Sequence, residues 1–168
     1  GIFVNRSNWS DDAVWMYFKA GPPQGHHAFR RGVLEGGHIH PDAGNILLWA
    51  NGKWILIDDG YTYRKDTSTH NIFRFNGLGQ LGEGKPFYVK SELASFGKDV
   101  GFKNLNHRGD SVVIKANLDG AYPKKSNLVE WKRQIGLFKE NLLFIKDSVG
   151  LIRNGLIEQL LYINGDYY

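Results

Sequence analysis

Short apolar segments separated by turn residues recur along the whole chain. They predict β-strands over residues 13–19, 45–50, 53–58, 71–76, 87–91, 111–118, 128–138, 141–149 and 156–163. Aromatic and β-branched residues dominate these segments, and no apolar stripe of helical period extends beyond a turn or two. Many short strands at close spacing predict an all-β fold, an antiparallel β-sandwich, which we expect to form a single domain over residues 1–168.

Two segments carry more specific local signals. Asn51-Gly52 stands between two apolar runs, and this pair predicts a hairpin with a type I′ turn because both turn residues must adopt a positive φ. Residues 139–141 predict a second tight turn. The stretch 24–37 is rich in Gly, His and Arg and has no clear period, so we expect a long loop, a kind of segment that often carries function.

Composition narrows the classes of function. The chain has no cysteine, which excludes both a disulfide framework and a thiolate zinc site. The net charge of +4 suits an anionic partner, either nucleic acid or an acidic polysaccharide, but the basic residues form no long run. No segment approaches the ~18 apolar residues of a membrane helix. Residues 1–4 do not resemble a signal peptide, and both ends of the sequence suggest a piece of a longer protein.

Three histidines and an aspartate define the candidate chemistry. His38 and His40 stand two residues apart, so in an extended segment they point to the same side. Asp58 ends the second hairpin strand, and His70 opens the next predicted strand. Two imidazoles and a carboxylate form a common zinc set with one position left for water. The spacing alone leaves open that these are surface loop histidines and that Asp58 only begins a turn.

The blocks around these residues resemble a known family. The stretch from Gly37 to Tyr61, with Gly-His-Ile-His-Pro-Asp at its start and Leu-Ile-Asp-Asp-Gly-Tyr at its end, is similar to the signature of heparinase II/III-like polysaccharide lyases. Thr69-His70-Asn71 and Gly77-Leu78-Gly79-Gln80 continue the similarity, and residues 129–149 around Arg133 extend it more weakly. The resemblance implies the β-sandwich domain of such an enzyme.

The resemblance also implies roles for the site residues. It implies that His40, Asp58 and His70 bind a Zn²⁺ ion that holds the substrate cleft together, and that His38 faces that cleft. It implies β-elimination on a uronic acid, in which a base removes a proton beside a neutralised carboxylate. Asp42 is then expected to orient an imidazole, or else only to close the turn after Pro41.

Further residues are candidates for catalysis or substrate binding. Tyr61 and Tyr63, between Asp58 and His70, are candidate acid or base groups, although either could instead pack over the hairpin. His27, Arg30 and Arg31 are candidates for binding sugar carboxylates, or are solvated loop residues without a task. His107 and Arg108 are expected in a loop. Trp49 and Trp54, on either side of the Asn-Gly turn, are expected to pack in the core rather than to stack on sugars.

The full enzymes of this family carry a helical toroid domain, and this chain shows none. We therefore expect a zinc-bearing domain of a lyase that acts on an acidic polysaccharide, alginate or glycosaminoglycan-like, with little turnover on its own. Neither nucleic acid nor a membrane is an expected partner, and a bacterial periplasmic or secreted location is expected. A non-catalytic, zinc-stabilised carbohydrate-binding domain is the alternative. A cupin-like metalloenzyme also uses His-x-His, but the flanking blocks here do not resemble cupins.

Overall fold

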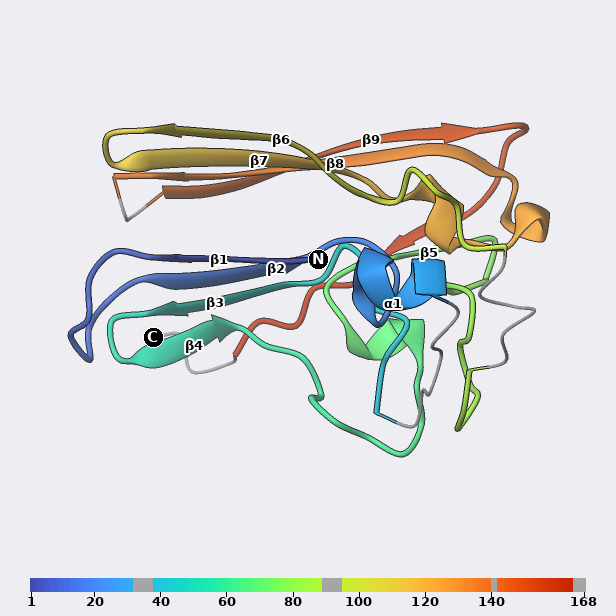
Figure 1. Ribbon diagram of the computed structural model, residues 1–168, viewed down its shortest axis with the longest axis horizontal. Coiled ribbons are helices and arrows are strands. Elements are labelled where there is room, and N and C mark those ends of the chain that lie inside the picture. Colours follow the sequence, from blue (N-terminus) through green and yellow to red (C-terminus); the bar gives the residue numbers. More distant parts are fainter. Residues whose placement is uncertain (32–37, 89–94, 140–141, 165–168) are drawn as a thin grey trace.

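Two four-stranded antiparallel sheets lie face to face in the computed structural model, which describes residues 1–31, 38–88, 95–139 and 142–164 (Figure 1). Each sheet is a meander whose strands pair in the order in which they occur along the chain. The first sheet contains β1 (Ile2–Arg6), β2 (Trp15–Lys19), β3 (Ile46–Ala50) and β4 (Lys53–Leu56). The second contains β6 (Gly101–Arg108), β7 (Ser111–Asn117), β8 (Leu128–Phe138) and β9 (Leu142–Leu151). The predicted all-β sandwich is confirmed.

A smaller pairing and a few short helices complete the described part of the chain. Strand β5 (Phe73–Phe75) pairs with β10 (Ile157–Gln159). Beyond β10 the chain runs along β4, where Ile57 N donates to Tyr162 O and Asn164 N donates to Ile55 O. The helical elements are α1 (Gly25–Arg31) and the single 3₁₀ turns η1 (Thr67–Thr69), η2 (Asp119–Ala121) and η3 (Lys124–Ser126). None of the helices in these ranges is long and apolar enough to cross a membrane.

The core forms where the inward faces of the two sheets meet. In β2, Met16 and Phe18 are fully buried while their neighbours are only half-buried, the alternation that a pleated strand with one packed face requires. Ile114 in β7 and Ile135 in β8 supply the facing layer. The aromatic ring of Trp131 packs edge to face against Phe73. One contiguous apolar cluster therefore joins both sheets and β5.

The Asn-Gly hairpin forms as predicted. Asn51 and Gly52 have φ values of 52° and 74°, both in the left-handed region that a type I′ turn needs. The turn joins β3 to β4, and a bulge between Leu48 and Trp49 shifts the register of the pair. The hairpin reverses the direction of the chain, so the segment after β4 lies beside the segment before β3.

Several elements differ from the sequence-based expectation. Residues 25–31 form helix α1 and not a loop, and the rest of the expected loop, residues 32–37, lies outside the described residues. Residues 87–88 are not a strand, and 89–91 lie outside the described residues. Lys139 does occupy a turn with φ 47°, while 140–141 lie outside the described part. β6 was not predicted, because most of its side chains are exposed and it has no continuous apolar face. His107 and Arg108 belong to this strand rather than to a loop.

A buried arginine ties the second sheet to the loops at the end of the first. Arg133 is 1% exposed and binds Asp147 through two hydrogen bonds, Nε–Oδ1 of 2.8 Å and Nη2–Oδ2 of 3.0 Å. Its Nη1 donates to Gly44 O at 2.8 Å and to Asn71 O at 2.7 Å. Trp131 Nε1 also donates to Asp147 Oδ1 at 2.7 Å. The bonds to Asp147 stay within the second sheet, whereas the bonds to Gly44 and Asn71 cross 89 and 62 positions of sequence to the other layer, so this residue fixes how the layers meet.

Replacing Arg133 with methionine is expected to destabilise the fold strongly. The apolar side chain fills part of the space but removes both charged hydrogen bonds from the half-buried Asp147, which keeps only Trp131, and leaves Gly44 O and Asn71 O without their donor. Breaking such an ion pair typically costs about 3–5 kcal/mol. Urea denaturation followed by circular dichroism measures the loss. Lys132→Met, on the exposed neighbour in the same strand, is the control and should change the free energy of unfolding little. Equal stability of the two variants would contradict this role of Arg133.

Candidate functional site

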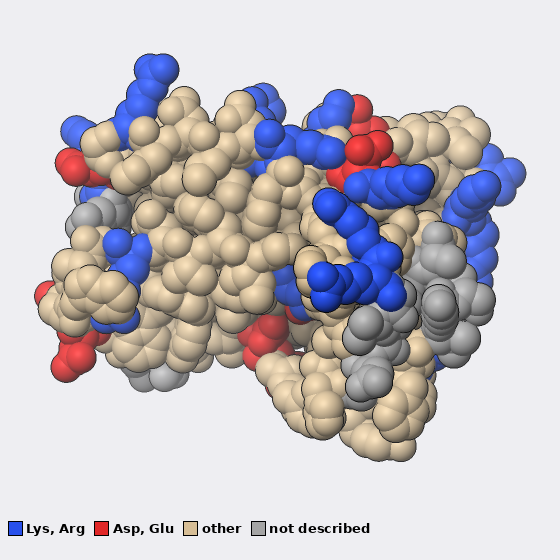
Figure 2. Space-filling view, in the orientation of Figure 1, with Lys and Arg blue, Asp and Glu red and all other residues tan. Residues whose placement is uncertain are grey.

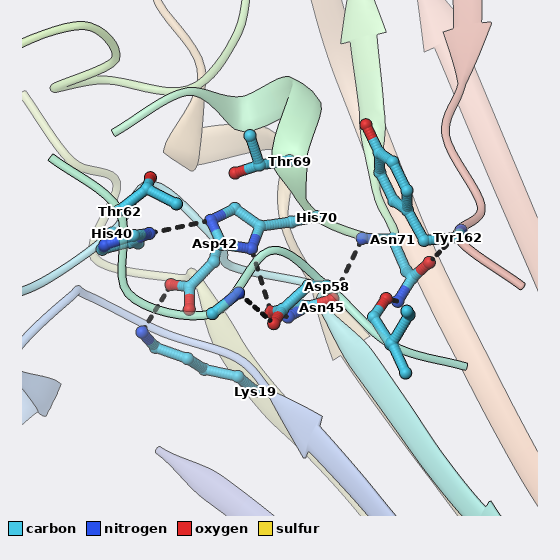
Figure 3. Close-up of polar contacts among 12 residues, drawn as sticks. Lys19, His40, Asp42, Asn45, Asp58, Thr62, Thr69, His70, Asn71 and Tyr162 are labelled. Atoms are coloured by element: carbon cyan, nitrogen blue, oxygen red, sulfur yellow. Dashed lines mark hydrogen bonds and ion pairs between the residues drawn. The ribbon is translucent and has the colours of Figure 1, made fainter. Parts of the chain in front are cut away.

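Three loop segments bring His40, Asp58 and His70 into one hydrogen-bonded chain. His40 precedes β3, Asp58 follows β4, and His70 follows η1. His70 lies in the middle: its Nε2 is 3.2 Å from His40 Nδ1, and its Nδ1 is 3.1 Å from Asp58 Oδ2 (Figure 3). His70 is 2% exposed and His40 is buried as well. The convergence expected from the hairpin is therefore present.

Two asparagines hold these segments in place. Asn45 donates from Nδ2 to Asp58 Oδ2 at 2.7 Å and accepts at Oδ1 from the backbone N–H of Asn71 at 3.0 Å (Figure 3). Asn71 is fully buried, and its Nδ2 donates to Ile46 O and Ile57 O at 2.8 and 2.7 Å. Its Oδ1 accepts from Tyr162 N at 2.7 Å. The asparagine beside His70 thus fastens β3, the end of β4 and the C-terminal segment to one another.

The Gly-x-Gly-Gln block fastens the loop that follows His40. The side-chain amide of Gln80 forms two hydrogen bonds with the backbone of Ala43. Its Oε1 accepts from Ala43 N at 2.9 Å, and its Nε2 donates to Ala43 O at 2.6 Å. A Cβ at Gly79 would stand 2.2 Å from Glu83 Oε1, so a larger residue here would displace the Glu83 carboxylate. That carboxylate accepts from the backbone N–H groups of Gly79 and Thr67, both at 3.0 Å. The Gly-x-Gly-Gln block therefore fixes the loop that follows His40.

The surroundings shift the proton affinity of the site groups. Burial alone would raise the pKa of Asp58, but hydrogen bonds from His70, Gly60 and Asn45 outweigh it and hold the pKa below its ordinary value. Burial, reinforced by the neighbouring His70, lowers the pKa of His40. A carboxylate kept charged beside an imidazole kept neutral is the protonation state in which both groups can bind a metal cation.

The donor set fits a zinc ion at the histidine pair. Two nitrogens that share one tetrahedral zinc at about 2.0–2.1 Å stand about 3.4 Å apart, close to the 3.2 Å between His40 Nδ1 and His70 Nε2. His40 Nε2, the ring nitrogen that does not face His70, is buried and has no hydrogen-bond partner among the described residues. Asp58 occupies the other nitrogen of His70. Within the described ranges, no three His, Cys, Asp or Glu side chains already surround one point.

The orienting role expected of Asp42 falls to Asp58. Asp42 forms an ion pair with Lys19, at the end of β2 (Figure 3). The same residue also closes a turn, since its backbone oxygen accepts from Asn45 N at 3.0 Å. Asp58 is the carboxylate that accepts from an imidazole, the arrangement by which an outer group fixes the orientation of a ligand histidine.

His38 and both candidate tyrosines line one small cavity beside the buried pair. The cavity, of about 170 Å³, is bounded by His38, Tyr61, Tyr63, Lys65, Pro86 and Phe87. The Tyr61 ring stacks on His38 with a centroid distance of 5.4 Å and lies 5.8 Å from His40. Tyr63 is 86% exposed, so it does not pack over the hairpin. The structure thus brings the three expected catalytic side chains together.

Lys65 is the cavity residue that the sequence did not reveal. Its side chain is buried, its Nζ donates to Pro86 O at 2.6 Å, and it lies over the ring of Tyr88. Burial lowers the pKa of its ammonium group. Nothing local in the sequence marks it, because lysine is ordinarily a surface residue and its burial follows from the path of the chain after β4.

The expected substrate-binding residues lie apart from this cavity. His27, Arg30 and Arg31 sit on α1 with exposed side chains, and in the described structure none of them lines the cavity at His38. Arg30 instead borders a separate cavity of about 460 Å³ with Pro22, His26, Phe29, Gly97 and Lys98. Figure 2 shows Lys and Arg side chains gathered over the half of this face where α1 lies. The helix therefore contributes to a positive surface.

Comparison with known proteins identifies the family. Residues 1–151 match the sequence profile of the family described as "Heparinase II/III-like, C-terminal". The chain belongs to this family. Comparison of the sequence with curated proteins gives no significant match.

Solved structures share the fold. A protein described as "Heparinase III-BT4657 gene product" superposes with a TM-score of 0.65 at 22% identity. The heparan sulfate lyase HepC from Pedobacter heparinus gives 0.65 at 18% identity, and a structure described as heparinase III gives 0.63 at 15%. In each case the alignment covers 94% of this chain but only 22% of the other protein. The chain therefore spans about a fifth of the length of these relatives.

Replacing Asn71 with alanine is expected to unfasten the site and the C-terminal segment together. Two buried carbonyl groups and one N–H lose their partner, and each unsatisfied group costs about 1–3 kcal/mol. Thermal unfolding followed by circular dichroism measures the loss of stability. The exposed Asn104→Ala on β6 is the matched control and should leave the midpoint unchanged. A midpoint for Asn71→Ala equal to that of the control would show that this residue does not fasten the segments.

Proposed function

We propose that this chain is the zinc-bearing β-sandwich domain of a polysaccharide lyase that cleaves uronic-acid-containing polysaccharide by β-elimination. The observation that carries the proposal is the placement of His38, Tyr61 and Tyr63 around one cavity, directly beside the buried chain formed by His40, His70 and Asp58. Membership of the heparinase II/III-like family and the titles of the similar structures, which name heparinase III and a heparan sulfate lyase, support the same reaction class.

His40 and His70 would hold the zinc ion, with Asp58 completing the set either as a third ligand or through its hydrogen bond to His70. The ion would join the loop before β3 to the loop after η1, and so brace the wall on which His38 and Tyr61 stand. His38 itself is exposed, and its ring contacts Tyr61, which positions it for substrate rather than for the metal.

The cavity residues supply the groups that β-elimination requires. A base takes the proton from C5, the electron pair forms the C4–C5 double bond, and the C4–O4 bond breaks as an acid protonates the departing O4. Histidine side chains titrate near neutral pH, so an imidazole such as His38 suits the base. Tyr61 or Tyr63 then donates to O4. The ammonium group of Lys65, on the same cavity wall, neutralises the uronate carboxylate in part and so stabilises the carbanion-like state.

The remaining groups bind parts of the charged polymer beyond the reacting bond. His27, Arg30 and Arg31 on α1 donate hydrogen bonds to the carboxylates of sugar units beyond the reacting one. The planar guanidinium of arginine suits this contact because it can bind a carboxylate through two hydrogen bonds. A helical toroid domain of the same protein would close the other side of the cleft, which in this chain is open at Tyr63. An acidic polysaccharide of the alginate or glycosaminoglycan class is the substrate, and a bacterial periplasm or exterior is the location at which such a polymer is met.

A non-catalytic carbohydrate-binding domain is the second candidate. The exposure of His38 and Tyr63 favours it, since a binding surface needs no closed cleft. The two candidates share the metal and the fold. They differ in whether His38 takes part in bond cleavage.

Elemental analysis of the purified chain tests the metal site. We expect about one zinc per chain in the wild type and a clear loss in His40→Ala and in His70→Ala, because each removes an imidazole ligand. His107→Ala, on β6, is the matched histidine control and should keep the metal. Asp58→Asn distinguishes the two possible roles of this carboxylate. Loss of the metal identifies Asp58 as a ligand, and a weakened affinity for zinc identifies it as a group that orients His70. A folded wild type without zinc would refute the metal site.

Cleavage by the full-length protein tests the catalytic role of His38. Removing a general base typically costs about 10²–10⁴-fold in rate, so His38→Ala should lower the appearance of the ultraviolet-absorbing unsaturated uronate by that factor. Zinc content should be unchanged, since His38 is not in the buried chain. Unaltered cleavage by His38→Ala would exclude its role in elimination and favour the binding domain.

A further inference from the structure

Four of the five tryptophans gather at one end of the first sheet. This is the end drawn on the left of Figure 1, where β1 ends and β2 begins. Trp15 opposes Trp49 across β2 and β3, and Trp49 opposes Trp54 across β3 and β4. The Trp54 ring stands edge-on to both of the others, with centroid distances of 5.5 Å to Trp15 and 5.4 Å to Trp49. Trp9 lies in the loop between β1 and β2.

These rings are not part of the buried core. Trp131 is the one tryptophan with no exposed surface, whereas Trp54 is 37% exposed and Trp9 is 89% exposed. The expectation that Trp49 and Trp54 pack in the core is therefore wrong: both face away from the sandwich interior and border a cavity of about 410 Å³. That volume lies within the ~300–1,000 Å³ typical of small-molecule sites. Clustered exposed aromatic rings commonly mark a binding surface.

Polar groups are fixed on the rim of this cavity, which is lined by Arg6, Asp11, Ala13, Trp15, Trp49 and Trp54. The Arg6 guanidinium donates to the carbonyl oxygens of Asn8 and Ser10 at 2.5 and 3.0 Å and lies 5.0 Å from the centre of the Trp9 ring. No carboxylate in the described ranges pairs with Arg6, so its charge remains open to a ligand. The indole N–H of Trp49 donates to the backbone oxygen of Asp11 at 3.4 Å, which holds the loop in place.

The cavity shares a face of the sheet with the histidine site. Trp15, Tyr17 and Lys19 alternate in β2 with the core residues, so all three point away from the interior. Lys19 pairs with Asp42, two residues beyond His40. Four residues of strand, about 13 Å, separate Trp15 from Lys19. A single chain of linked sugars lying along β2 would reach from one site to the other.

We propose that the tryptophan cavity is a second sugar-binding site, which takes a pyranose unit of the same acidic polysaccharide at a distance from the reacting bond. The apolar face of a pyranose ring stacks on the exposed indole of Trp54, Arg6 binds the uronate carboxylate, and Asp11 accepts from hydroxyl groups. The identity of the sugar rests on the proposed lyase function, whereas the cavity and its aromatic lining do not.

The full-length protein with Trp54→Ala tests this site. With long heparan sulfate or alginate chains as probes, KM should rise about 2- to 10-fold, the loss expected for one stacked ring, while kcat stays unchanged. Fragments too short to reach from the histidine site to the cavity should be cleaved equally by variant and wild type. Leu105→Ala, which removes a similarly exposed side chain from β6, is the control. Circular dichroism verifies the fold of each variant.

Direct binding separates this proposal from the proposed function. Calorimetric titration of the probes into His38→Ala, with and without Trp54→Ala and Arg6→Gln, measures affinity whether or not the protein is a lyase. Weaker binding in both added variants supports the site even if no cleavage is found. Affinity that is unchanged by both substitutions overturns the proposal. Trp54 fluorescence that the sugars neither quench nor protect from quenching overturns it as well.

Discussion

The buried guanidinium of Arg133 is the constraint on which the other contacts depend. An arginine with almost no exposed surface is tolerable only if its donors are satisfied, and here they reach Asp147 in the neighbouring strand and two backbone oxygens in the first layer. Those oxygens belong to Gly44 and Asn71, the residues next to Asn45 and His70. The rings of Phe73 and Trp131 cover its faces. The same interaction therefore closes the sandwich and places the histidine site.

From this anchor the site follows as a sequence of directional hydrogen bonds. Arg133 donates to the backbone oxygen of Asn71, whose backbone N–H donates to Asn45. Asn45 then donates to Asp58, and Asp58 is hydrogen-bonded to His70. Each step joins residues of different segments of the chain, so none of them is set by local conformation. The outcome is a buried, hydrogen-bonded imidazole pair beside a solvent-facing group formed by His38, Tyr61 and Tyr63. Side chains held by hydrogen bonds next to an accessible surface are the arrangement that functional sites generally need.

How much of this the sequence predicts differs from element to element. The hairpin was predictable because Asn51-Gly52 has a strict backbone requirement, and the return of Asp58 to Asn45, just before β3, follows from it. The strand β6 was not, because an exposed strand with polar side chains has no period-two apolar signal. Helix α1 was missed because it is short and has no buried residue. Lys65 and the outward turn of Trp54 depend on the path of the chain in space, which composition and spacing do not report.

The segment after β9 extends the domain beyond the C-terminal end of the family match. The match ends at residue 151, yet the backbone beyond it continues the first sheet: Tyr162 N reaches Asn71 Oδ1 across 91 positions of sequence, and Asn164 N pairs with Ile55 O. A polypeptide shortened to the matched region would leave β4 as an open edge and Asn71 with an empty acceptor beside His70. Residues 152–164 are thus part of the wall that shapes the histidine site, although they contribute no side chain to its chemistry.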